Sequence, residues 1–126
     1  MNSISSIDSE LIELLRTELG FSSNASIRQE SALGDKYPIQ FDLVIEDDNK
    51  IYVVELKRVV RFESLSQMGF LKLLLSARDV ETGNIQLVMA GKRITPEALE
   101  AAKKIGIRFI KLPANIGLEE ARDKPG

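Results

Sequence analysis

The chain has 126 residues, of which 44% are hydrophobic and 29% charged, a balance typical of one folded α/β domain rather than a disordered segment. It contains no cysteine, which excludes a disulfide framework, a zinc–thiolate site and thiol catalysis. It also contains no histidine, so any acid–base or metal chemistry must depend on carboxylates, lysine, hydroxyls or an oxygen-bound ion.

The formal net charge of −2 argues mildly against nucleic acid as a partner, because nucleic-acid-binding domains are usually basic. The basic residues are not evenly spread, however. They form two clusters, one of Lys57, Arg58 and Arg61 and one of Lys92 and Arg93.

The limits of the domain follow from its hydrophobic pattern. No apolar run approaches the roughly 20 residues that span a membrane, and the polar first residues lack the features of a signal peptide. We therefore expect one cytoplasmic domain over residues 1–126 without a membrane partner, with its core at about 6–112 and a polar tail over 113–126.

Hydrophobic periodicity predicts eight elements in the order α-β-β-β-α-β-α-β. Helices are expected over about 6–19, 62–79 and 96–104, and strands over about 25–32, 39–46, 51–58, 85–90 and 107–112. A hairpin that leads into helical crossovers predicts a mixed sheet with helices on both faces.

The turn Asp47–Lys50 joins two of these strands, since its residues tolerate turn conformations. If the turn is centred between Asp48 and Asn49, Asp42 lies directly opposite Glu55, with Cβ atoms roughly 4.5–5.5 Å apart. Two carboxylates held that close repel each other, an arrangement that makes sense if a cation sits between them. A one-residue bulge in the turn would break this register.

The cation at such a pair should be hard. Carboxylate oxygens together with a backbone carbonyl, for which Leu56 is the candidate, suit Mg²⁺ or Mn²⁺. Lys57 shares the face of Glu55, and its ammonium can position an attacking water and offset charge on a phosphate. The alternative is a solvated pair of acids with Lys57 as salt-bridge partner, but Ile51 and Val53 on the same face indicate that the face is partly covered.

The two helices on either side of the hairpin offer further candidates. Gln67 falls among Phe70, Leu71 and Leu74 on an apolar arc, where a glutamine needs hydrogen-bond partners. It is either a core amide bonded to the backbone or a part of the site. The first helix offers three glutamates, among which periodicity makes only a weak choice: Glu10, Glu13 and Glu18.

Asp42 followed by Glu55-Leu56-Lys57 is a D-x12-E-x-K pattern placed on a hairpin. Together with the element order, it resembles the PD-(D/E)XK nuclease superfamily over about residues 8–112. The resemblance implies a restriction-endonuclease-like αβββαβ core and a metal-dependent nuclease. Phe41 stands where the superfamily motif has proline, a replacement that the superfamily tolerates.

Within the superfamily, the chain resembles most the catalytic domain of archaeal NucS-type mismatch endonucleases. Holliday-junction resolvases and Mrr-like restriction nucleases are more distant likenesses. The stretches that carry the likeness are 51–58, the helix around Gln67, and 94–98 leading to Gly106. The N-terminal DNA-binding domain of the NucS type has no counterpart in these residues, so mismatch specificity is not expected of this chain alone.

The resemblance also assigns roles to individual residues. It implies that Asp42 and Glu55 are metal ligands and that Lys57 is the catalytic lysine. It places a supporting glutamine at Gln67, and its helix glutamate maps best to Glu10.

We therefore expect an endodeoxyribonuclease that hydrolyses DNA phosphodiester bonds with Mg²⁺ or Mn²⁺. The alternative is a non-catalytic nuclease-fold module that binds nucleic acid or a partner protein. Because the basic surface is small, we expect a homodimer or a DNA-binding partner protein. The residues expected to contact DNA are Arg58, Arg61, Lys92 and Arg93.

Overall fold

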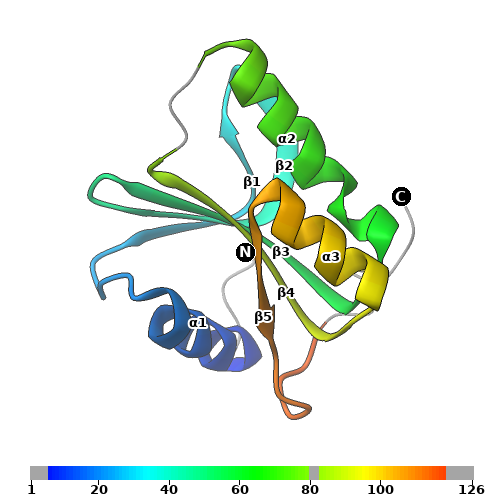
Figure 1. Cartoon of the computed structure of the whole chain (residues 1–126). Helices are drawn as coiled ribbons and strands as arrows, with labels where there is room; N and C mark the ends of the chain where they lie inside the picture. The colour runs from blue at the N-terminus through cyan, green and yellow to red at the C-terminus, as the bar shows by residue number, and fades with distance from the viewer. Residues whose placement is uncertain (1–5, 80–82, 119–126) are drawn as a thin grey trace.

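A computed structural model describes residues 6–79 and 83–118, which form a five-stranded sheet with helices on both faces (Figure 1). The elements are α1 (Ser6–Leu19), β1 (Ser26–Gly34), β2 (Tyr37–Asp47), β3 (Lys50–Val60), the 3₁₀ helix η1 (Phe62–Leu65), α2 (Ser66–Ala77), β4 (Ile85–Ile94), α3 (Pro96–Ile105) and β5 (Ile107–Lys111). The predicted order of helices and strands is confirmed.

The sheet is mixed, as predicted, with the strand order β1-β2-β3-β4-β5. The hairpins make β1, β2 and β3 antiparallel, whereas the crossovers through α2 and α3 make β3, β4 and β5 parallel. Asp47 pairs with Lys50, so the turn has the predicted centre, and Asp48 adopts a left-handed φ of 53° that aspartate tolerates.

The first helix covers one face of the sheet. Leu11 and Leu15 of α1 pack in a buried cluster with Tyr52 and Val54 of β3. Ile116, which is 3% exposed, belongs to the same cluster. The core therefore extends beyond the expected limit at residue 112 to include Ile116, while residues 119–126 of the expected polar tail lie outside the described part.

The other face of the sheet is covered by α2 and α3, which lie side by side in Figure 1. The α2 residues in this buried cluster are Met68, Leu71 and Leu75. The ends of α3 are those that the sequence predicts. The Thr95 side chain accepts a hydrogen bond from the Ala98 N–H, and Gly106 ends the helix with a φ of 88°.

Two boundaries differ from the prediction more than the others do. The helix expected over 62–79 starts as the 3₁₀ turn η1, and only Ser66–Ala77 is α-helical. The strand expected over 85–90 continues to Ile94, because its polar end still pairs with β3, for example Arg93 with Val59.

Within the described ranges, no helix is long and apolar enough to cross a membrane.

Candidate active site

The antiparallel strands β2 and β3 separate at Asp42 and Glu55. Their backbone pairing ends at Leu43 and Val54, one residue short of the two acids. Beyond this point β2 stays paired with β1, while β3 stays paired with β4. The two carboxylates therefore lie where the backbones of β2 and β3 would be hydrogen-bonded to each other if the pairing continued.

Two hydrogen bonds cross between the strands at this point. The Leu56 N–H donates to Asp42 Oδ2 at 2.7 Å, and the Asp42 N–H donates to Glu55 Oε2 at 3.3 Å. Because the N–H and C=O of one strand residue point to the same side, the Leu56 carbonyl also points toward β2. The structure thus brings together the two carboxylates named from the sequence, and strand geometry turns the Leu56 carbonyl toward the same strand.

Glu55 is the one charged side chain among the described residues that is buried, with 7% of its surface exposed. Burial, followed by the negative charge of Asp42, raises the pKa of Glu55 to about 8, while the positive charge of Lys57 acts in the opposite direction. At neutral pH, and with no further cation beside it, the Glu55 carboxyl is therefore mostly protonated.

Lys57 is held in place by a close approach of two backbones. It lies opposite Gly91 in the parallel ladder of β3 and β4. A Cβ atom on Gly91 would lie 2.6 Å from the Lys57 carbonyl oxygen and 2.9 Å from Val60 Cγ2. Only glycine lets the strands meet here, so Gly91 is a positioning residue that the sequence reasoning missed.

The predicted environment of Gln67 is wrong. Gln67 is exposed, and Phe70, expected beside it on the core-facing arc, is 63% exposed. The α2 side chains that are buried against the sheet are Met68, Leu71 and Leu75, which are centred on another side of the helix.

Gln67 nevertheless lies on a flank of α2 that is turned toward the hairpin of β1 and β2. It precedes Arg78 by eleven residues, about three helical turns, so both residues lie on the same side of the helix. The Arg78 guanidinium lies 5.1 Å from the ring centre of Tyr37 and donates to the Lys36 carbonyl at 2.8 Å. Since Asp42 belongs to β2, this flank is the one from which Gln67 can approach the site.

The structure does not bring Glu10 to the acid pair. Glu10 is exposed on α1, which packs against the face bearing Val54 and Leu56. Strand alternation puts Glu55 on the opposite face. Accordingly, residues 6–79 and 83–118 contain no group of three or more acidic side chains that could hold a metal ion. A helical wheel drawn from the sequence shows on which side of α1 Glu10 lies. It cannot show which face of the sheet α1 covers.

The other two helix glutamates have arginine partners. Glu13 pairs with Arg16 on α1, and Glu18 lies 3.3 Å from Arg108 of β5.

The two basic clusters lie at the same end of the sheet. Arg58 and Arg61 follow Lys57 at the end of β3, and Lys92 and Arg93 follow Gly91 at the end of β4. Arg58, Arg61 and Arg93 are exposed, while the Lys92 ammonium donates to the Ala114 carbonyl at 3.1 Å. Because β3 and β4 are parallel neighbours, the clusters adjoin each other next to Lys57.

The described residues have a restriction-endonuclease-like α/β fold, as the D-x12-E-x-K resemblance implies. No protein-family model and no curated protein sequence matches the chain. Solved structures do match it, and they include NucS/EndoMS-type repair endonucleases.

Three solved structures illustrate the similarity. A repair endonuclease from Pyrococcus abyssi matches 89% of this chain and 49% of its own, with a TM-score of 0.59 and 21% identity. EndoMS in a complex with double-stranded DNA matches 94% of this chain and 48% of its own, with a TM-score of 0.59 and 18% identity. EndoMS in its apo form matches 89% and 48%, with a TM-score of 0.53 and 19% identity. The chain thus shares their fold over about half of their length.

Proposed function

We propose that this domain is a metal-dependent endonuclease that hydrolyses DNA phosphodiester bonds at a centre formed by Asp42, Glu55 and Lys57. The observation that carries the proposal is the buried carboxyl of Glu55 beside Asp42, with Lys57 two residues further on the same face. A buried acid next to a second acid destabilises a fold. Such arrangements are common at functional sites, where a bound cation or substrate offsets the cost.

The donor set fits a hard divalent ion. Asp42 and Glu55 would supply carboxylate oxygens. The Leu56 carbonyl, which strand geometry turns to the same side as its N–H, is the third proposed donor. Magnesium commonly binds proteins through one or two carboxylates and keeps several waters, so a pair of acids suffices. Bound there, Mg²⁺ or Mn²⁺ would lower the pKa of a coordinated water and offset charge on the phosphate.

The remaining residues of the proposal act on the substrate. The Lys57 ammonium orients the attacking water and stabilises negative charge on the phosphate. Gln67 approaches from the flank of α2 and supports the site. Glu10 is not part of the proposed centre, because α1 packs against the opposite face of the sheet.

DNA is the proposed substrate because positive side chains gather beside Lys57. Arg58, Arg61, Lys92 and Arg93 lie at the ends of two adjacent strands, where they can contact phosphates on either side of the scissile bond. The EndoMS structure with double-stranded DNA supports the same substrate class. Because the net charge of the chain is −2, we propose that it acts as a homodimer or with a DNA-binding partner protein.

The purified chain should be incubated with labelled single-stranded, duplex, flap and mismatched DNA, in Mn²⁺, Mg²⁺ or EDTA. We expect cleavage of at least one substrate with Mn²⁺, none in EDTA, and none by Asp42→Asn. This variant keeps an oxygen that can accept the Leu56 N–H, so it preserves the local hydrogen bond. Binding without cleavage in every condition would overturn the nuclease proposal in favour of a non-catalytic binding module.

A further inference from the structure

The backbone of Glu30, in the middle of β1, is left-handed. Its φ angle is 47°, whereas antiparallel strand residues have φ angles of about −140°. Residues with a side chain rarely adopt this conformation, because it brings the Cβ atom too close to the following carbonyl oxygen. The other described non-glycine residues with a positive φ are Asp48, in the turn between β2 and β3, and Asp79, just after α2. Among the described residues, Glu30 is thus the non-glycine residue that has a positive φ inside a strand.

Glu30 lies opposite Asp42 of β2. The backbone pairs on either side of this position are Gln29 with Leu43 and Ser31 with Phe41. Both pairs belong to one register, so the two strands stay aligned through the kink and no residue is inserted. The left-handed residue of β1 and the first acid of the proposed centre therefore lie at the same level of the sheet.

The strand β2 is irregular at the same level. In a regular strand, residues two apart point to the same face of the sheet. Phe41, however, packs in the buried cluster on the side of α2 and α3, whereas Leu43 packs in the cluster on the side of α1. Because these two residues flank Asp42, the alternation of side chains along β2 is broken at Asp42.

This irregularity accounts for the direction of the Asp42 side chain. Side chains of a regular strand stand roughly perpendicular to the sheet, away from the backbone of the next strand. Asp42 Oδ2 instead accepts a hydrogen bond of 2.7 Å from the Leu56 N–H of β3. The carboxylate is therefore turned into the gap between β2 and β3, where Glu55 also lies.

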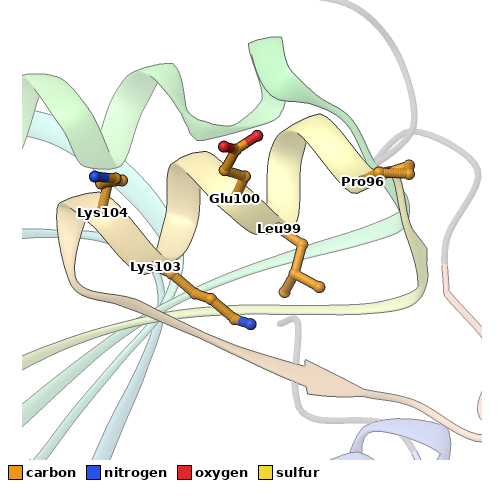
Figure 2. Close-up of a pocket in the computed structure, with 5 residues that line it drawn as sticks. All are labelled: Pro96, Leu99, Glu100, Lys103 and Lys104. Carbon is orange, nitrogen blue, oxygen red and sulfur yellow. The ribbon is translucent and has the colours of Figure 1, made fainter.

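A strained backbone persists only where the surrounding structure holds it, and such residues cluster at functional sites. The pocket in Figure 2 is not formed by this kink, because its lining residues all belong to α3: Pro96, Leu99, Glu100, Lys103 and Lys104. The group of the proposed centre that lies next to Glu30 is Asp42.

We infer that Glu30 is a positioning residue, whose left-handed backbone turns the Asp42 carboxylate toward Glu55. The consequence for catalysis rests on the proposed function, which this residue deepens by fixing the geometry of the centre. The Glu30 side chain is exposed, and the described residues contain no group of three acids that could hold a metal ion. Its backbone conformation, and not its charge, is what the position supplies.

Substitutions at Glu30 separate backbone conformation from charge. Glycine adopts a left-handed backbone freely and asparagine tolerates it, yet neither carries the carboxylate. Valine and threonine favour strands, but their branched Cβ atoms resist a positive φ. Because Glu30 is exposed, none of these side chains needs space in the core. Asp79→Val is the matched control, since it places the same branched side chain at a φ of 55° outside the strands.

Amide hydrogen exchange of the metal-free protein tests the kink without depending on nuclease activity. The quantity measured is the exchange rate of the Leu56 N–H divided by that of the Val88 N–H in the core of β4. Glu30→Val and Glu30→Thr should raise this ratio about tenfold, the effect of losing a hydrogen bond to a carboxylate. Glu30→Gly, Glu30→Asn and Asp79→Val should leave it within about threefold, since the Asp42–Leu56 bond remains. Circular dichroism verifies that each variant is folded.

Single-turnover DNA cleavage tests the consequence for the centre. Glu30→Val should cleave at least about tenfold more slowly, because a small displacement of a catalytic group is costly. Glu30→Gly and Glu30→Asn should stay within about threefold of the wild type, because both keep the left-handed backbone.

The exchange ratios and the cleavage rates fail in different ways. An unchanged exchange ratio in Glu30→Val and Glu30→Thr would overturn the inference. Equal losses in all four Glu30 variants would also overturn it, because they would assign the role to the carboxylate, as would an equal rise in Asp79→Val. A wild type that cleaves no DNA would contradict the proposed function, while the exchange ratios would still decide whether Glu30 positions Asp42.

Discussion

Replacing Lys57 with alanine is expected to lower the rate of Mn²⁺-supported DNA cleavage by roughly 100–1,000-fold, the usual effect of removing one group that stabilises transition-state charge. Lys57 is half-buried on the face of Glu55, and its charge lowers the pKa of that carboxyl. In the proposed reaction the substitution therefore removes the ammonium that would contact the phosphate, and it also raises the pKa of Glu55. We expect the residual activity to have its pH optimum shifted upward.

Single-turnover cleavage with saturating enzyme measures this rate without a contribution from product release. Lys50→Ala is the matched control, because it removes the same charge from the exposed opposite end of β3. It should retain activity within about threefold, whereas a Lys57→Ala protein as active as wild type would show that Lys57 takes no part in the reaction.

The second large effect concerns the stability of the metal-free protein as a function of pH. Burial and the charge of Asp42 raise the pKa of Glu55 from 4.5 to about 8, so the folded chain binds this proton more tightly than the unfolded chain. The stabilising contribution is complete below about pH 4.5 and is lost as the pH rises to about 8. At about 1.36 kcal/mol per pKa unit, the loss due to Glu55 is on the order of several kcal/mol.

Urea unfolding between pH 5 and 9 should isolate this effect when the wild type is compared with Glu55→Gln. The difference in unfolding free energy between the two proteins should grow in favour of the variant as the pH rises. If the ionised pair binds Mn²⁺ as proposed, the ion should restore the stability of the wild type at high pH. It should not restore Asp42→Asn. Parallel pH profiles for wild type and Glu55→Gln would mean that Glu55 is not the perturbed group.

The hairpin could be predicted because its determinants are local. Strand alternation and the turn residues Asp47–Lys50 fix the register, so the meeting of Asp42 with Glu55 follows from the sequence. The sequence also indicates α3, where Thr95, Pro96 and Gly106 mark both ends. Such signals act over a few residues and need no knowledge of the remaining fold.

The surroundings of the site depend on contacts between elements and could not be predicted in the same way. Apolar residues occur on more than one side of α2, so a helix wheel cannot tell that Phe70 is exposed while Met68 is buried. Likewise, in the sequence Gly91 looks like the residue that ends the strand, because it follows the hydrophobic run 85–90. Its close approach to Lys57 exists only because β4 continues along β3 to Ile94.

The most direct test of the proposed centre is a crystal of the protein with Mn²⁺ and a short DNA duplex, measured at the manganese absorption edge. We predict an anomalous peak between the carboxylates of Asp42 and Glu55, at the roughly 2.0–2.2 Å ligand distances of a small hard cation, with a DNA phosphate beside Lys57. A manganese peak at other residues, or DNA bound away from Lys57 with this pair empty, would contradict the account.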